Sequence, residues 1–257
     1  IVQPTKTRPL MTILSEQYKI IASIYDELHA DAIDQLSVNL INFLEELKFT
    51  PSTVLDLGCG SGRLLRNLQT TIPYCAGCDL SPEMISEARK LSPRINKIEC
   101  SSMLDLKPDR CFELIICTND AINYLKPIEW NVLFGKIKQW LHPGGYFYFD
   151  FTTNLDIRTV WPHYRDYLEG NGWFCCKINE YDIDQKAGIE RQVWFVKQGK
   201  DYVRFEEQHT LYGPTLHEIE MFSKNADLFI KHIIDPISFR KADPENLLRV
   251  GMFITTA

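Results

Sequence analysis

The chain has 257 residues, of which 45% are hydrophobic and 24% charged, and its formal net charge at pH 7 is −6. This composition is close to that of soluble globular proteins, and the length suits one large α/β domain with an elaboration or two small domains. An acidic chain gains no general attraction to phosphate backbones, so the charge disfavours nucleic acid as a partner.

Residues 1–12 are expected to lie outside the folded part of the protein. The chain opens with Ile1, and residues 1–10 are rich in proline, threonine and basic side chains. This pattern is typical of a disordered arm, of residues added ahead of a natural start at Met11, or of the cut edge of a longer polypeptide.

The eight cysteines point to a reducing compartment and to no metal centre. Most of them lie in apolar, strand-like runs, where a thiol behaves as a small buried hydrophobe. Cys75 and Cys78 have the spacing of a metal-ligand pair, but no second pair accompanies them, so we expect no metal. No stretch approaches the roughly 18 apolar residues of a membrane span, and no signal-peptide pattern is present. We therefore predict a cytoplasmic protein with no membrane partner.

The first 151 residues predict a helix followed by alternating strands and helices. The apolar spacing indicates a helix within residues 13–47, and Pro51 marks the break before the first strand. The elements expected after this break are strands over 53–57, 74–79, 97–100, 112–118 and 146–151, helices over 62–69, 82–91 and 130–141, and a turn over 142–145. Ser81 is expected to cap the helix that begins at Pro82. Alternation of strands and helices predicts a parallel sheet.

The pattern changes to hairpins after residue 171. We predict three strands over 172–181, 189–197 and 202–211, joined by short polar turns. A helix over 215–226 with a capping box of Thr215 and Glu218 follows, and then two strands over 228–234 and 248–255 that form an antiparallel edge. The expected fold is a Rossmann-like, doubly wound, mostly parallel seven-stranded sheet with an antiparallel last strand, formed by residues 13–171 and 212–257. Residues 172–211 are expected to form an antiparallel β lid over the substrate site.

The most specific signal is the run VLDLGCGSGRL around Gly58. An apolar stretch ends at Asp56, and glycines at positions 58, 60 and 62 precede a helical pattern, which is the nucleoside-binding corner of a doubly wound domain. A dinucleotide fingerprint needs glycine at the sixth position from Gly58, where this chain has Arg63. Asp56 would repel a diphosphate, but it suits a cofactor with an ammonium, a sulfonium and no phosphate. We therefore predict that Asp56, Gly58, Gly60 and Gly62 bind S-adenosylmethionine.

A second carboxylate is placed to bind the ribose of the same cofactor. Asp79 ends the second strand, 21 positions after Gly58. A carboxylate at that point accepts charge-assisted hydrogen bonds from both ribose hydroxyls. Leu80 and Met84 are expected to flank the adenine, although Met84 also fits the core.

Taken together, these segments resemble the class I S-adenosylmethionine-dependent methyltransferases. The resemblance covers residues 18–150 and rests on three motifs in the right order: DLGCGSG from Asp56, GCDLSPEM from Gly77 and LHPGG from Leu141. The segment from Tyr18 to Asp26 and the late hairpins are similar to the small-molecule branch that includes amino-sugar N-methyltransferases. The resemblance implies transfer of a methyl group by in-line displacement to a nitrogen or oxygen of a small-molecule acceptor, which leaves S-adenosylhomocysteine.

The region that contacts the adenine departs from the family pattern. Many relatives have an aspartate for the adenine amino group, followed by a hydrophobic residue, whereas this chain has Ser102 and Met103. A serine hydroxyl accepts a hydrogen bond from the amino group more weakly than a carboxylate does. We expect Ser102 and Met103 to make these contacts, with Asp105 as an alternative acid in a shifted register.

The loop after the fourth strand is expected to lie beside the sulfonium. It lacks the Asn-Pro-Pro-aromatic signature of enzymes that methylate base or amide nitrogens, which disfavours a DNA substrate. We predict that Asn119 contacts the cofactor and that Asn123 and Tyr124 contact the substrate. The alternative is ordinary loop polarity.

Two tyrosines in the amino-terminal segment are expected to cover the methionine end of the cofactor. Tyr18 and Tyr25 are seven positions apart and share a helical face. They would hydrogen-bond the cofactor carboxylate and shield the sulfonium from water. The alternative is that both are core aromatics.

Glu207 and His209 are the candidates for a general base. They alternate onto one face of the third lid strand, where an imidazole beside a carboxylate is poised near neutral pH. A hydroxyl acceptor needs such a base, whereas an amine needs only to arrive deprotonated. The alternative is an exposed polar strand face.

Two other functions remain open from the sequence. The first is an inactive S-adenosylmethionine-binding partner subunit, and the second is a nicotinamide-dependent oxidoreductase, which Arg63 and Asp56 disfavour. Monomer and homodimer are both compatible with the sequence.

Overall fold

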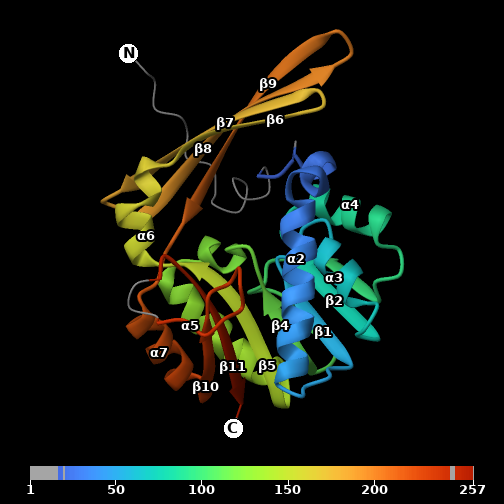
Figure 1. Ribbon diagram of the computed structural model, residues 1–257, viewed down its shortest axis with the longest axis vertical. Coiled ribbons are helices and arrows are strands. Elements are labelled where there is room, and N and C mark those ends of the chain that lie inside the picture. Colours follow the sequence, from blue (N-terminus) through green and yellow to red (C-terminus); the bar gives the residue numbers. More distant parts are fainter. Residues whose placement is uncertain (1–16, 20, 244–246, 257) are drawn as a thin grey trace.

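The larger of the two sheets in the computed structural model has seven strands. They are β1 (Thr53–Leu57), β2 (Tyr74–Asp79), β3 (Lys97–Cys100), β4 (Phe112–Cys117), β5 (Leu141–Thr152), β10 (Leu228–Ile234) and β11 (Arg249–Thr256). Their order is β10-β11-β5-β4-β1-β2-β3 (Figure 1). The first five are parallel to one another, whereas β11 is antiparallel to both of its neighbours, β5 and β10. The predicted doubly wound sheet with an antiparallel last strand is confirmed.

The structure describes residues 17–19, 21–243 and 247–256. The arm expected over residues 1–12 and the first part of the helix expected from residue 13 lie outside these residues. Residues 17–19 form a turn, and Ala22–Ile24 form a 3₁₀ turn, η1, before the helix α2 (Tyr25–Glu46). The predicted helix over residues 13–47 is therefore wrong for residues 17–19 and 22–24, which precede the α-helix.

The central strands form because they are apolar on both faces. In β1 four of the five residues are buried, and in β4 five of the six are buried. Strands that are buried on both sides are typical of parallel sheets covered by helices on each face. Only Asp56 interrupts the apolar run of β1 with a charged group.

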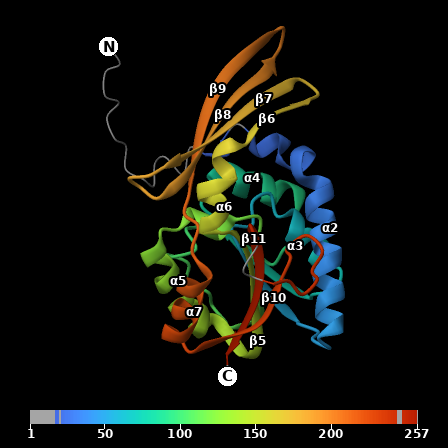
Figure 2. The same cartoon turned by 60° about the vertical axis from the view of Figure 1, so that its left-hand side comes forward.

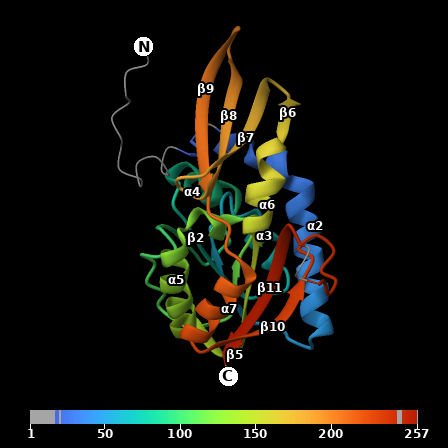
Figure 3. The same ribbon diagram turned by 90° about the vertical axis from the view of Figure 1, so that its left-hand side faces the viewer.

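Helices cover both faces of this sheet. In chain order they are α2, α3 (Arg63–Leu68), α4 (Pro82–Leu91), the 3₁₀ turn η2 (Ala121–Tyr124), α5 (Pro127–Trp140), α6 (Asn154–Thr159), the 3₁₀ turn η3 (Trp161–His163) and α7 (Leu216–Asn225). One core cluster packs α2, α3 and α4 on one face, and another packs α5 and α7 on the opposite face (Figure 3). No helix within the described residues is both long and apolar enough to cross a membrane.

The predicted helix starts agree with the observed caps. The Ser81 hydroxyl accepts a hydrogen bond from the Met84 N–H at 3.2 Å, and Pro82 occupies the first turn of α4. Thr215 and Glu218 form the expected capping box of α7. These local devices satisfy backbone N–H groups that have no partner within the helix.

A second sheet rises above the edge at which β1, β2 and β4 end (Figures 1 and 2). Its strands, in spatial order, are β6 (Arg165–Gly170), β7 (Trp173–Asp182), β8 (Ala187–Gln198) and β9 (Asp201–Leu211). The last three match the expected hairpins, and β6 is an additional strand that the sequence pattern does not predict. Trp173 and Trp194 pack with Ile21 of the amino-terminal segment, and the Trp173 indole donates a hydrogen bond to Glu27 at 3.2 Å.

Residues 142–145 also differ from the expectation of a turn. They belong to β5, where the register with β4 shifts between Phe112 and Leu114. Phe112 pairs with Leu141 and Leu114 pairs with Tyr146, so the two glycines lie within a bulge of the strand. Only glycine fits at position 145, because a Cβ there would lie 2.5 Å from the Glu113 carbonyl oxygen.

Trp130 of α5 is one of two fully buried tryptophans among the described residues, and its indole N–H donates to the Leu125 carbonyl at 3.1 Å. Replacing it with alanine leaves a cavity, so we expect Trp130→Ala to lower the free energy of unfolding by about 3–5 kcal/mol in urea denaturation. Ile128 of the same helix is 71% exposed, and Ile128→Ala is the matched control, expected within about 0.5 kcal/mol of the unmodified protein. Equal losses in the two variants would contradict this account of the core.

Candidate functional site

A cavity of about 490 Å³ lies at the carboxyl ends of β1, β2, β3 and β4. In a doubly wound sheet, ligands bind at this edge. Twelve of the residues predicted to bind cofactor or substrate line it: Tyr18, Tyr25, Asp56, Gly58, Gly60, Asp79, Leu80, Met84, Ser102, Met103, Asn119 and Tyr124. The remaining four, Gly62, Asn123, Glu207 and His209, are absent from its wall.

The glycine turn after β1 brings the backbone close to the cavity. The N–H groups of Gly58 and Cys59 both donate to the Cys78 carbonyl, at 2.8 and 2.9 Å. Gly58 has φ +84°, and a Cβ there would lie 2.8 Å from the Cβ of Ala121 in the loop after β4. Any larger residue would therefore push these two loops apart.

Gly62 shapes the turn from behind the cavity. It has φ +75° at the N-cap of α3, and a Cβ there would lie 3.3 Å from the Ser92 hydroxyl. The left-handed backbone favours glycine at this position. Gly62 thus begins α3, and its contact with the cofactor stays a prediction.

Asp56 is a buried carboxylate without a complete set of partners. The residue is 2% exposed, and no donor of the described residues hydrogen-bonds its Oδ1 atom. Burial, together with the smaller effect of the Asp79 charge, raises the pKa of this carboxyl to about 8. A cavity wall with an unpaired carboxylate is complementary to a cation.

Asp79 is held by the backbone on both sides of its carboxylate. Its Oδ2 accepts from the Gly60 N–H and its Oδ1 from the Ser81 N–H, each at 2.9 Å. Burial raises the pKa of this group and these backbone hydrogen bonds oppose the rise. Each oxygen keeps a second lone pair, so the fixed carboxylate can accept two further hydrogen bonds from a pair of adjacent hydroxyls.

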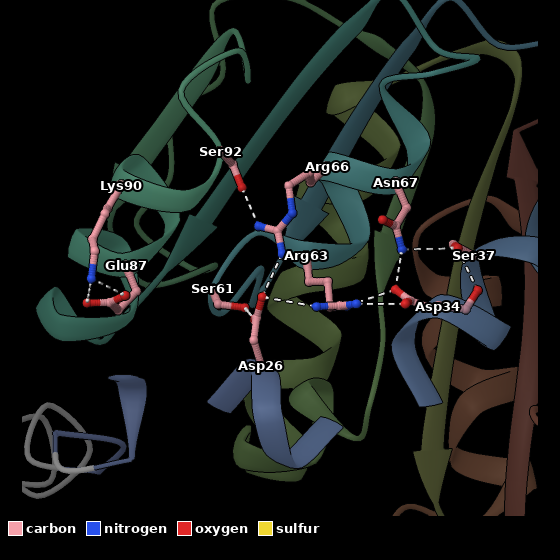
Figure 4. A network of polar contacts seen from close by, with 10 residues as sticks. All are labelled: Asp26, Asp34, Ser37, Ser61, Arg63, Arg66, Asn67, Glu87, Lys90 and Ser92. Carbon is pink, nitrogen blue, oxygen red and sulfur yellow. Dashed lines mark hydrogen bonds and ion pairs between the residues drawn. The ribbon is translucent and has the colours of Figure 1, made fainter. Parts of the chain in front are cut away.

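Ion pairs between α2 and α3 hold the amino-terminal wall of the cavity (Figure 4). Arg63 binds both oxygens of Asp34, at 2.8 and 2.6 Å, and Arg66 pairs with Asp26 at 2.6 Å. A two-pronged contact of this kind is the strongest geometry of an arginine–carboxylate pair. The arginine that replaces the sixth-position glycine of a dinucleotide motif therefore has a structural partner, which the sequence alone did not reveal.

The ion pairs between α2 and α3 position Tyr25 against the glycine turn. Asp26, the next residue, also accepts a hydrogen bond from the Ser61 hydroxyl within that turn. The Tyr25 ring would lie 3.7 Å from a Cβ at Gly60, and the Tyr18 ring meets it edge-on at 5.9 Å. Both tyrosines thus belong to the cavity wall.

The loop after β4 is held in a left-handed conformation from below. Asn119 and Asp120 have φ +55° and +58°, and their N–H groups donate to the buried Asp150 carboxylate at 3.1 and 2.9 Å. Arg249 pairs with Asp120 at 3.1 Å and with Asp150 at 3.4 Å. Burial raises the pKa of Asp120 to about 6, although the Arg249 charge opposes the rise.

Asn123 belongs to the framework of this loop. Its side chain is fully buried, donates to the carbonyls of Thr152 and Tyr212 at 2.8 and 3.0 Å, and accepts from the Thr152 N–H at 3.0 Å. Its amide group therefore has its main partners inside the protein. Asn123 is absent from the cavity wall, whereas Tyr124 lines it, and contact of either residue with substrate stays a prediction.

The adenine side of the cavity leaves two acceptors available. Ser102 and Asp105 both line it. The Ser102 hydroxyl accepts from the Leu104 N–H at 3.0 Å, which leaves its second lone pair to accept from another donor. Contacts of Ser102, Met103 or Asp105 with an adenine stay predictions.

Glu207 and His209 lie deeper in the molecule than a direct base would. Both side chains are 3% exposed, so the alternative of an exposed polar strand face is wrong. His209 reaches the cavity wall through Tyr124, whose hydroxyl is 2.7 Å from Nδ1. Direct contact of either residue with an acceptor is not supported by this geometry.

Metal-ligating side chains do not gather elsewhere in the part of the chain that the structure describes. No group of three or more histidine, cysteine, aspartate or glutamate side chains there is arranged to hold a metal ion. The cysteines of the described residues are free thiols. Cys75 and Cys78 are both buried in β2.

The fold is that of the doubly wound α/β class, with a cavity at the carboxyl ends of its parallel strands. A family model described as a methyltransferase domain matches residues 54–145. The chain is 28% identical over 221 residues to YqeM of Bacillus subtilis (strain 168), whose name describes a methyltransferase, covering 81% of this chain and 85% of that protein.

Two further relatives agree with this match. The chain is 30% identical over 164 residues to dTDP-3-amino-3,4,6-trideoxy-alpha-D-glucopyranose N,N-dimethyltransferase of Streptomyces venezuelae, covering 63% of this chain and 62% of that protein. A crystal structure of an S-adenosylmethionine-dependent methyltransferase from Clostridium acetobutylicum ATCC 824 superimposes with a TM-score of 0.81 at 26% identity, covering 93% of this chain and 99% of that one. Residues 54–145 therefore match a methyltransferase domain, and the chain is similar to S-adenosylmethionine-dependent methyltransferases over most of its length.

The raised pKa of Asp56 predicts a dependence of stability on pH. Between the ordinary aspartate value of about 3.9 and the folded value of about 8, the folded protein binds more protons than the unfolded chain. The free energy of unfolding therefore falls as the pH rises through this interval, by up to about 1.4 kcal/mol per pH unit for one group. Asp56→Asn should remove this contribution, so its stability relative to the unmodified protein should grow between pH 5 and pH 8 in urea denaturation. The exposed Asp184→Asn is the control, and parallel curves for Asp56→Asn and the unmodified protein would contradict the assignment.

Proposed function

We propose that this protein transfers a methyl group from S-adenosylmethionine to a nitrogen or oxygen of a small-molecule acceptor. The observation that carries the proposal is the buried Asp56 carboxylate, whose Oδ1 lacks a hydrogen-bond donor from the described residues while lining the cavity. A cationic methyl donor gains an attractive partner when this carboxyl ionises, whereas a phosphate beside it would oppose that ionisation. The residues present therefore fit the cofactor.

Different residues of the cavity would bind different parts of the cofactor. Asp56 would pair with its cationic end, and Asp79 would accept hydrogen bonds from the two ribose hydroxyls. The apolar side chains of Leu80, Met84 and Met103 would enclose the adenine. All five line the same cavity.

Methyl transfer requires no covalent intermediate with the protein. When bound, S-adenosylmethionine supplies the methyl group on a sulfonium, which is already a good leaving group. The protein's part is to align the acceptor behind the methyl carbon and to exclude water. Tyr18 and Tyr25 of the amino-terminal segment line the cavity together with Tyr124 of the loop after β4, whose hydroxyl lies 2.7 Å from that of Tyr18.

A small acceptor fits the enclosure and the charge of the chain. The second sheet packs onto the amino-terminal segment through Trp173 and Trp194, and Tyr18 of that segment lines the cavity. The acidic net charge disfavours a polyanionic substrate. Nitrogen is the first choice of acceptor atom, because the relative from Streptomyces venezuelae is named as an N,N-dimethyltransferase of an amino sugar.

Release of S-adenosylhomocysteine over a panel of small amines, amino sugars and hydroxylated compounds tests this function directly. We expect turnover with at least one amine and none with DNA or RNA. Tight binding of S-adenosylmethionine without turnover on any acceptor would favour the alternative of a binding subunit. Binding of NADH in preference to S-adenosylmethionine would contradict the proposal entirely.

Asp79→Ala tests the assignment of the ribose site. Loss of a charge-assisted pair of hydrogen bonds should cost more than about 1 kcal/mol, which corresponds to a loss of cofactor affinity of more than about fivefold. Isothermal titration calorimetry with S-adenosylhomocysteine measures this change. Asp109→Ala removes a carboxylate that is 54% exposed outside the cavity and serves as the control. Affinity of Asp79→Ala within about twofold of the unmodified protein would contradict the ribose assignment.

A further inference from the structure

A line of four polar side chains connects the cavity to the interior of the lid. The Tyr18 hydroxyl lies 2.7 Å from the Tyr124 hydroxyl, which lies 2.7 Å from His209 Nδ1. On the far side of the imidazole, Nε2 lies 3.4 Å from Glu207 Oε2. The two tyrosines line the cavity, and the other two side chains lie behind them.

His209 and Glu207, at the buried end of this line, carry polar atoms whose burial destabilises the fold. His209 Nε2 and Glu207 Oε1 are both buried, and neither has a hydrogen-bond partner among the described residues. Polar atoms buried without partners destabilise a fold. If the imidazole became protonated, its charge would meet the Glu207 carboxylate at 3.4 Å and gain an ion pair away from water.

The hydroxyls are suited to pass a proton without holding a charge. Burial raises the pKa of both Tyr18 and Tyr124 well above the ordinary value of a phenol. A tyrosinate at either position is therefore unfavourable. Each hydroxyl can still accept one proton while it donates its own to the next atom in the line.

We propose that Tyr18 and Tyr124 carry a proton from the acceptor to His209, with Glu207 stabilising the imidazolium. This inference rests on the proposed methyl transfer to a small amine. The ammonium form of the acceptor gives its proton to the Tyr18 oxygen, the Tyr18 hydrogen moves to the Tyr124 oxygen, and the Tyr124 hydrogen moves to His209 Nδ1. The result is a neutral amine with a free electron pair and one imidazolium, so atoms and charge balance.

The charged groups around His209 leave Glu207 as its nearest partner. Glu190 of β8 stands opposite His209 in the sheet, and its carboxylate lies 3.9 Å from Lys177 of β7. His29 of α2 is close to the same pair, and burial lowers its pKa to about 4, so it stays neutral near pH 7. Lys177 and Glu190 are thus one cation and one further anion near His209. Glu207 is the carboxylate that contacts the imidazole.

The line also has a structural role, which the test must separate from proton transfer. Glu207 Oε2 accepts a hydrogen bond from the Tyr18 backbone N–H at 3.2 Å, and the Gln17 side chain donates to the Gln208 carbonyl. These contacts join the amino-terminal segment to β9. A purely structural network would not depend on which imidazole nitrogen carries the hydrogen.

Nitrogen-15 NMR of the full chain labelled on histidine gives a readout that needs no acceptor. Proton acceptance at Nδ1 requires the neutral tautomer with hydrogen on Nε2, facing Glu207. We expect this tautomer for His209 in the unmodified protein and a shifted Nδ1 resonance in Tyr124→Phe. Hydrogen on Nδ1 would overturn the proposal, because the imidazole would then donate to Tyr124 and accept nothing from it. This outcome is separate from any failure of methyl transfer itself.

Steady-state rates as a function of pH test the relay once an amine acceptor is found in the panel. We expect Tyr124→Phe to lower kcat at pH 6.5 by about 100-fold, the lower end for a general base, and to approach the unmodified rate at pH 9.5, where the amine arrives deprotonated. His209→Gln should give the same profile, and the double variant should be no slower than either single variant.

The control replaces a tyrosine far from the line. Tyr74 begins β2 at the opposite end of the sheet, so Tyr74→Phe should keep the unmodified pH profile. An equal fractional loss in Tyr124→Phe at every pH would indicate only positioning and would overturn the relay. No loss at pH 6.5 would overturn it as well. If Tyr124→Phe does not fold, the tautomer of His209 in the unmodified protein still decides the question.

Discussion

The structure depends on a carboxylate that the fold does not satisfy. Asp56 interrupts an otherwise buried apolar strand, and its Oδ1 faces no donor from the described residues. Burial and the neighbouring charge of Asp79 both oppose its ionisation. A sequence selected for stability alone would place an apolar or amide side chain there. A cationic ligand in the cavity would supply the missing partner, and in the proposed function the residue that weakens the free protein would thereby favour binding of the cofactor.

Three segments that are distant in the sequence are held in place around that carboxylate: the amino-terminal segment, the loop after β4 and the second sheet. The amino-terminal segment is fixed by the ion pairs that Asp26 and Asp34 make with arginines of α3. The loop after β4 is fixed by hydrogen bonds to the buried Asp150. The lid is joined to both, because Tyr124 of the loop lies within hydrogen-bond distance of Tyr18 and of His209 in β9. Movement of any one segment would therefore alter the wall on which an acceptor must rest.

Local patterns were reliable where burial or a single turn decides the structure. The parallel strands were predictable because an apolar run such as that of β4 has no stable place except between helical layers. By contrast, β6 escaped prediction because it is a largely exposed strand at the edge of the lid sheet. It has no apolar alternation in its sequence RDYLEG, and only pairing with β7 makes it a strand. The bulge in β5 was missed for a related reason, since Gly144 and Gly145 suggest a turn until the register with β4 is known.

The sequence by itself determined the glycine turn, the two carboxylates at the strand ends and the helix caps, because each depends on residues a few positions apart. Only the tertiary structure decided that Tyr124 reaches the cavity while Asn123 holds the loop. It also decided that His209 connects to the cavity through tyrosines 85 and 191 positions earlier in the chain. Such contacts form between segments that meet only after the lid, the loop and the amino-terminal segment have packed together. A pattern that repeats every two or four residues carries no information about which of those segments will become neighbours.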